Sequence, residues 1–134
     1  MSLDIQQRER EGVAILDMNG RLTVGEDVSR FRDRMQKLIA AGSRDIILNM
    51  EQLDYVDSTG LGALVMFYTT LQKAGGKVKL VNLTRRSIEL LVMTKLSTIF
   101  EIFDDEQNAI NSFFPDREIK RFDILNFVQH MKEE

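Results

Sequence analysis

The pattern of apolar and polar positions changes several times along the chain, and each change predicts a new element. The apolar run at residues 13–18 is short and stops at Asn19-Gly20, which favours a strand followed by a tight turn or a bulge. Before it, Leu3 and Ile5 alternate with polar residues, which is typical of an edge strand.

Helical spacing begins at about residue 24 and continues to residue 41. The apolar positions of this segment recur three or four residues apart; they are Val28, Phe31, Met35, Leu38 and Ile39. Gly42 stands where a helix would end. The continuous apolar centre of residues 45–50 then predicts a strand covered on both faces. Polar residues 51–57 predict a connection to a second helix at 58–74, which Gly75-Gly76 closes.

The same alternation continues in the second half of the chain. Residues 77–82 predict a strand with one face wetter than the other, and residues 85–95 a third helix. A short strand includes Ile102 and Phe103, and a fourth helix covers 106–113. The order predicts an α/β fold with parallel pairing wherever a helix crosses over. We expect a mixed, mostly parallel sheet of four or five strands with helices packed on it, plus a C-terminal helical tail.

The only proline, Pro115, falls where this alternation ends. The segment after it is highly charged, and an apolar stripe then follows helical spacing at Ile124, Phe127, Val128 and Met131. Asp123 is a good N-cap for that helix. We therefore predict a domain at residues 1–114 and an amphipathic helical extension at 115–134. The stripe must bury itself on its own domain, on a second copy of the chain or on a dedicated partner, and we favour its own domain.

The amino-acid composition limits the kinds of functional site that the chain can form. The 134 residues include no cysteine and one histidine, which excludes cysteine-based zinc sites, iron–sulfur clusters, thiol nucleophiles and disulfides. We expect no enzyme activity, no cofactor and no metal. The formal net charge of −3 lacks the basic excess of a DNA-binding protein, so no direct nucleic-acid contact is expected. The sequence shows neither a signal-like apolar region nor a membrane-span run, which predicts a cytoplasmic protein without membrane insertion.

The most informative stretch is residues 57–62, Asp-Ser-Thr-Gly-Leu-Gly, where the second predicted helix begins. Two glycines in a first helical turn each cost about 1 kcal/mol relative to alanine, so something other than helix stability selects them. A helical wheel places one arc in the core, formed by Leu61, Leu64, Val65, Tyr68 and Leu71. The opposite arc is small and partly apolar, and consists of Thr59, Gly62, Ala63, Met66 and Thr70.

Two interpretations of this helix remain open from spacing alone. The smooth opposite arc suits a protein contact better than a solvated face. Alternatively, Asp57 or Ser58 is only an N-cap and the glycines only permit tight packing inside the protein.

This motif, placed between the strand at 46–50 and the strand at 78–81, resembles the STAS domain of bacterial anti-sigma factor antagonists. The resemblance covers about residues 5 to 114 and includes Gly20-Arg21-Leu22 and the late segment 91–103. It implies that Ser58 is phosphorylated by an anti-sigma factor that is also a serine kinase. The unphosphorylated antagonist would bind that kinase and free the sigma factor, and a phosphatase acting on phospho-Ser58 would reset the cycle.

On this resemblance the partner-binding residues are expected to be Thr23, Asp57, Ser58, Thr59, Gly60, Gly62, Ala63 and Met66. Many antagonists carry an acidic residue shortly after the Gly-x-[Leu/Ile] element. Here Thr23 follows Leu22, and the acidic residues Glu26 and Asp27 come a few positions later, which affects the details of the kinase contact. Thr59 is a second candidate phosphoacceptor. A homodimer formed through the C-terminal tail is a further expectation.

Other functions fit the residues less well. A phosphate-binding loop of the kinase type is absent, and a dinucleotide-binding turn would need a third glycine where Val65 stands. A hydrolase built on Ser58, His130 and Asp57 lacks Gly-x-Ser-x-Gly. The acidic run at 104–106 is read more simply as favouring a helix start than as a cation site. The main alternative is a structural STAS subunit of a stress-sensing scaffold or of a lipid or anion transport complex.

Overall fold

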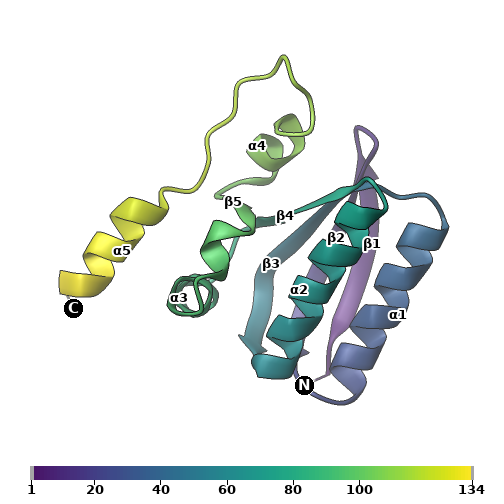
Figure 1. The fold of residues 1–134 in the computed structure, drawn as a ribbon, viewed down its shortest axis with the longest axis horizontal. Coiled ribbons are helices and arrows are strands. Elements are labelled where there is room, and N and C mark those ends of the chain that lie inside the picture. Colours follow the sequence, from purple (N-terminus) through teal and green to yellow (C-terminus); the bar gives the residue numbers. More distant parts are fainter. Residues whose placement is uncertain (1, 134) are drawn as a thin grey trace.

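The computed structural model describes residues 2–133, which fold around a five-stranded sheet (Figure 1). The strands are β1 (Asp4–Arg10), β2 (Val13–Leu22), β3 (Asp45–Val56), β4 (Lys77–Val81) and β5 (Glu101–Phe103), and they lie side by side in that order. β1 pairs antiparallel with β2, whereas all other neighbours are parallel. The predicted mixed, mostly parallel sheet is confirmed.

Helices cover the two faces of the sheet unequally. The larger core lies under α1 (Glu26–Ala40), α2 (Ser58–Lys73) and α3 (Arg85–Met93), with a short 3-10 turn, η1 (Leu96–Thr98), after α3. A smaller core on the other face lies under α4 (Glu106–Asn111). In β3, Ile46 and Leu48 belong to the larger core and Ile47 to the smaller one. The predicted two-sided burial of this strand is therefore confirmed.

The predicted connection at residues 51–57 is wrong, because β3 continues to Val56. Its extension pairs with the end of β2, with Leu53 opposite Gly20 and Val56 opposite Leu22. Leu53 and Val56 are buried, while the polar residues between them are exposed beyond the part of the sheet that α4 covers. A strand with one solvated face carries such a polar pattern.

Asn19-Gly20 forms an irregularity inside β2 and does not end the strand. The register with β3 shifts between Asp17 and Asn19 and again between Gly20 and Arg21. Gly20 has φ 104°, and a Cβ there would lie 2.3 Å from the carbonyl oxygen of Ser2. Of the two predicted outcomes, the bulge is confirmed.

The wetter face predicted for residues 77–82 is also wrong, because Lys79 is buried. Its Nζ donates to the carbonyl oxygen of Ser112 at 3.2 Å and pairs with Glu101 at 2.8 Å. The ring of Phe113 lies 4.5 Å from Nζ. The chain after α4 therefore surrounds a lysine that the alternation assigned to solvent.

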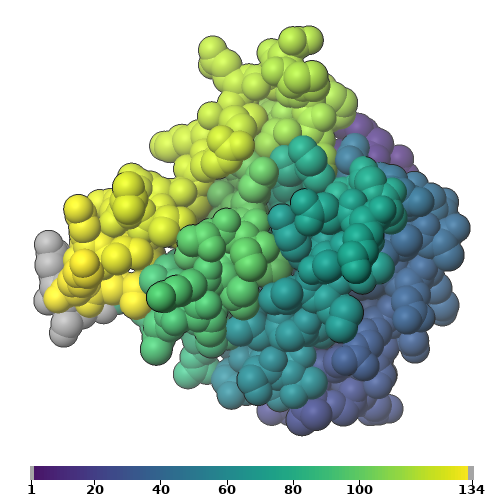
Figure 2. Space-filling view, in the orientation of Figure 1, coloured from purple at the N-terminus to yellow at the C-terminus, as the bar shows by residue number. Residues whose placement is uncertain are grey.

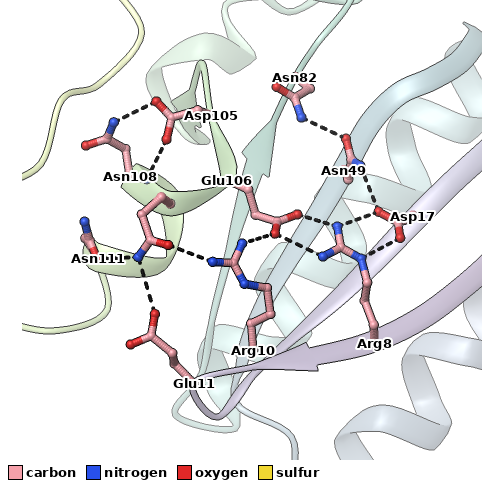
Figure 3. Close-up of polar contacts among 11 residues, drawn as sticks. Arg8, Arg10, Glu11, Asp17, Asn49, Asn82, Asp105, Glu106, Asn108 and Asn111 are labelled. Carbon is pink, nitrogen blue, oxygen red and sulfur yellow. Dashed lines mark hydrogen bonds and ion pairs between the residues drawn. The ribbon is translucent and has the colours of Figure 1, made fainter.

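A polar cluster at the rim of the smaller core ties α4 to the sheet (Figure 3). Arg8 of β1 pairs with Asp17 at 2.7 Å and with Glu106 of α4, and Arg10 also pairs with Glu106. The hydrogen bonds from Arg8, followed by those from Arg10, hold the pKa of Glu106 below its ordinary value against the opposing effect of desolvation. Asn49 extends the cluster by donating to Asp17 at 2.8 Å.

The tail ends in α5 (Ile124–Glu133), and the predicted N-cap is confirmed because Asp123 accepts from the N–H of Asn126 at 3.0 Å. The chain before α5 folds back on the domain, whereas only Ile124 of the predicted apolar stripe packs on a core. Phe113, Phe114 and Ile119 pack on the smaller core, and Phe122 and Ile124 pack on the larger one. The N–H of Phe122 donates to the carbonyl oxygen of Ile102 at 3.0 Å, which partly covers the outer edge of β5.

None of the helices within residues 2–133 combines the length and the apolar character that a membrane span requires.

Candidate functional site

The side chain of Asp57 holds the turn between β3 and α2. Its Oδ1 accepts a hydrogen bond of 2.7 Å from the N–H of Gly60, and its Oδ2 accepts one of 2.9 Å from the N–H of Val24. These two hydrogen bonds, Val24 first, lower the pKa of Asp57 below its ordinary value. Asp57 is therefore the N-cap of α2 and also a tie to the loop between β2 and α1.

Ser58 is the first residue of α2, and it is exposed. Within residues 2–133 no hydrogen bond engages its hydroxyl. The start of a helix carries partial positive charge because its first N–H groups point outward. The hydroxyl is thus open to a modifying enzyme, and negative charge added to it meets a favourable helix end.

The two glycines of the motif have different surroundings. Gly60 is buried, and a Cβ built on it would lie 2.0 Å from the carbonyl oxygen of Leu22 at the end of β2. Gly62 is exposed, and a Cβ there would have nothing within 4 Å. Tight packing inside the protein therefore explains Gly60, whereas it leaves Gly62 unexplained.

The loop between β2 and α1 lies beside this turn and is held from its other side by Asp27. Asp27 is buried; its Oδ1 accepts from the N–H of Leu3 and its Oδ2 from the hydroxyl of Thr23, both at 2.9 Å. Desolvation would raise its pKa, but the hydrogen bonds from Leu3 and Thr23 outweigh it, so the pKa lies below the ordinary value. The two aspartates therefore fix the loop that carries Thr23.

The structure brings most of the predicted partner-binding residues to one surface. Asp57, Ser58 and Thr59 lie at the start of α2, and the Asp57–Val24 hydrogen bond places the Thr23 loop beside them. Gly62 and Met66 continue along α2 and are exposed, Met66 by 60%.

Two of the predicted residues are buried. Gly60 packs against β2, as described above. Ala63 is only 3% exposed, so its predicted place on the outer arc of the helix is wrong. The buried side of α2 also includes Phe67, whose ring makes an edge contact with Phe31 of α1 at 5.9 Å between centroids. Val65 and Tyr68, predicted in the core, are only partly buried and pack against it.

Sequence reasoning missed two exposed apolar side chains close to the motif. Val24 is 67% exposed and donates its N–H to Asp57. Tyr55 is 43% exposed at the end of β3, and the guanidinium of Arg86 lies 5.8 Å from its ring. Alternation in residues 53–56 could have identified Tyr55 as an outward strand position, had the strand been extended that far.

The acidic run at residues 104–106 takes structural roles. Asp105 is the N-cap of α4, accepting from the N–H of Asn108 at 2.8 Å, and Glu106 pairs with Arg8 and Arg10. Across the described part of the chain, residues 2–133, no group of three or more acidic or histidine side chains has a metal-binding arrangement.

Known proteins resemble this chain over most of its length. The family model of the STAS domain matches residues 4–109. The anti-sigma-B factor antagonist of Bacillus subtilis (strain 168) is 29% identical over 110 residues, which cover 82% of this chain and 99% of that protein. A Thermotoga maritima crystal structure superposes with a TM-score of 0.75 at 24% identity, covering 81% of this chain and 92% of that one. The phosphorylated form of the Bacillus cell fate determinant SpoIIAA superposes with a TM-score of 0.64 at 21% identity, over 82% and 99% of the two chains.

Proposed function

The chain belongs to the STAS domain family, and on that premise we propose that it is an anti-sigma factor antagonist switched by phosphorylation. In this function the unmodified protein binds an anti-sigma factor serine kinase and thereby frees a sigma factor for transcription. The observation that carries the proposal is Ser58, an exposed hydroxyl at the first residue of a helix whose cap is already supplied by Asp57. The Bacillus subtilis relative, an anti-sigma-B factor antagonist matched over nearly its whole length, supports it.

The switch consists of two balanced reactions at one atom. The kinase transfers the γ-phosphoryl group of ATP to Oγ of Ser58, releasing ADP and the hydroxyl proton. A phosphatase then uses water to cleave the phosphoester, which restores the hydroxyl and releases inorganic phosphate. SpoIIAA, a structural neighbour, has been solved in a phosphorylated form, which supports a cycle of this kind.

The surroundings of Ser58 favour a change of surface over a change of fold. Phosphate adds roughly −1.5 to −2 charges at neutral pH. Asp57 already accepts from Gly60 through its side chain and from Leu61 through its carbonyl oxygen, so phosphate cannot take those donors without displacing it. The phosphate therefore stays at the surface, where its charge and bulk oppose a docked partner.

A direct test uses the cognate kinase with ATP and the full chain. Intact mass should show one phosphate on the wild type and on Thr59→Ala, and none on Ser58→Ala. Thr59→Ala is the matched control because Thr59 is the neighbouring exposed hydroxyl. Modification that persists in Ser58→Ala contradicts the assignment of the phosphoacceptor.

Binding provides the second readout. By calorimetry, Ser58→Asp should bind the kinase at least about tenfold more weakly than the wild type, which is about 1.4 kcal/mol, while its circular dichroism stays unchanged. Equal affinity, or loss of the folded spectrum, contradicts the switch. Absence of phosphorylation together with co-purification in a large assembly would support the alternative, a structural STAS subunit.

The homodimer expected through the C-terminal tail stays a prediction. The best candidate surface is α5, where Leu125 is 78% exposed. Analytical ultracentrifugation should show a concentration-dependent dimer that Leu125→Glu abolishes. A monomer at all concentrations would contradict it.

A further inference from the structure

An apolar groove lies between α1 and α2, whose residues form the blue and teal surface on the right of Figure 2. It encloses about 210 Å³, which exceeds the roughly 150 Å³ cavity that holds a benzene ring. Buried apolar side chains line its inner part, namely Phe31, Met35, Ala63 and Phe67. Arg32, Gln36, Ile39, Met66 and Thr70 complete the lining. The groove has room for one large apolar side chain.

The groove is continuous with the surface around Ser58. Ser58, Gly62 and Met66 are spaced four residues apart, so they form one row along α2, and all three are exposed. At 1.5 Å of rise per residue, Met66 lies about 12 Å along the helix from Ser58. A partner that covers Ser58 and crosses Gly62 therefore reaches the groove.

Met66 is an unusual choice for the rim. It is 60% exposed although it borders an apolar groove that has space beside it. Methionine adapts its shape to a partner and is common on protein-binding surfaces. The small side chain of Ala63 keeps the inner part of the groove open, because a larger residue at this position would fill it.

The charged residues around the groove indicate which kind of peptide segment would bind there. The lining contains one cation, Arg32, and no acidic residue. α2 carries no acidic residue from Ser58 to Lys73, and its exposed Lys73 lies seven residues beyond Met66, on the same side. Asp33 of α1 directly follows Arg32, about 100° around the helix from it, and does not line the groove. The groove is therefore apolar inside, and the charged side chain of its lining is basic.

We propose that this groove takes one leucine or aromatic side chain from an acidic segment of the kinase. The proposal rests on the proposed function, because the phosphate would then weaken the complex by repelling that acidic segment. Arg32 attracts the acidic segment, and Met66 closes over the apolar side chain. Phosphate on Ser58, on the same row of α2, adds charge of the same sign as the segment.

The first test needs no kinase. The full chain with labelled methionine methyl groups is titrated, by NMR, with a synthetic glutamate-rich peptide that carries one phenylalanine. The methyl signals of Met66 and Met35 should shift saturably, whereas that of Met93, 75% exposed on α3, should not. Peptides with alanine for phenylalanine, or lysine for every glutamate, should bind at least about tenfold more weakly. Absence of saturable shifts, or equal shifts at Met93, overturns the proposal that the groove binds such a segment.

The second test uses the kinase with two pairs of matched variants. Met66→Ala and Arg32→Glu should each lower kinase affinity by about tenfold. Met93→Ala and Arg121→Glu, which change the same residue types on exposed positions elsewhere, should stay within about twofold of the wild type.

The two proposals fail in different ways. If the kinase binds the wild type and is insensitive to Met66→Ala and Arg32→Glu, the groove is overturned and the proposed function stands. If the peptide enters the groove but no kinase binds the wild type, the proposed function fails, and the assignment of the kinase as occupant fails with it.

Discussion

Alanine at Gly60 and alanine at Gly62 should change stability in opposite directions. A Cβ on Gly60 would stand 2.0 Å from the carbonyl oxygen of Leu22. Since real Cβ atoms keep at least 3.0 Å from backbone atoms, α2 and the end of β2 must separate by about 1 Å. That movement also loosens the hydrogen bond from the N–H of Asp57 to the same oxygen, 3.3 Å long.

The sizes of the opposing free-energy contributions decide whether each substitution raises or lowers the stability. Overpacking a rigid contact costs about 1–3 kcal/mol, and the weakened hydrogen bond adds about 1 kcal/mol. The better helix propensity of alanine returns about 1 kcal/mol. Gly60→Ala should therefore lower the free energy of unfolding by about 2 kcal/mol. Gly62→Ala has only the propensity gain, because nothing lies within 4 Å of its Cβ, and should raise it by about 0.5–1 kcal/mol.

Urea unfolding followed by circular dichroism measures both variants. With a slope of about 2 kcal/mol per molar urea, Gly60→Ala should lower the midpoint by about 1 M. Gly62→Ala should raise it, while binding the kinase more weakly because a methyl group now stands on the contact surface. A Gly60→Ala protein as stable as the wild type would refute the packing argument. Undiminished kinase binding by Gly62→Ala would refute the contact argument.

Three further predictions concern the cap, the polar cluster and the tail. Because the folded-state pKa of Asp57 is lowered, its stabilisation is present above about pH 4 and is lost as the pH falls through the folded-state value. Asp57→Asn should therefore be less stable than the wild type at pH 7, with a difference that shrinks in acid-titrated urea unfolding. Glu106→Gln should cost about 1 kcal/mol at low salt, and less at high salt, because its pairs with Arg8 and Arg10 are partly exposed. Removing residues 113–134 should expose both cores and lower the melting temperature by well over 5 °C, whereas removing only 125–134 should change it little.

The sequence could predict those helices and strands whose pattern is set by the burial of apolar side chains in one core. α1 is one such case, because Val28, Phe31, Met35 and Leu38 all turn to a single core and helical spacing follows directly. The end of β3 is the opposite case. Its outward side chains meet solvent, so the strand looks like a polar connection until its pairing with β2 is known.

Within the motif, the sequence could predict a capping side chain, but not which other residues of α2 are buried. Asp57 is the cap, and Ser58 beside it is exposed, so its part in a protein contact stays a prediction. Ala63 was misplaced because the predicted core arc left out Phe67, which lies one turn along α2 on the same side as Ala63 and is 4% exposed. The neighbouring helix decides which arc is buried, through the contact of Phe31 with Phe67. A contact between segments 36 residues apart has no local signature.

The two aspartates whose hydrogen bonds hold the site, Asp27 and Asp57, also limit how a phosphate on Ser58 can act. Asp57 and Asp27 hold the loop between β2 and α1 from two sides, through Val24 and Thr23. As long as Asp57 keeps its hydrogen bonds to Gly60 and Val24, a phosphate on Ser58 leaves that loop and the fold behind it in place. In the proposed switch, the partner then senses the phosphate by direct contact, which requires its own surface to lie over Ser58 and the first turns of α2. That requirement is why we place the exposed Gly62 and the groove beside Met66 on the contact surface of the proposed switch, although neither takes part in the chemistry of phosphorylation.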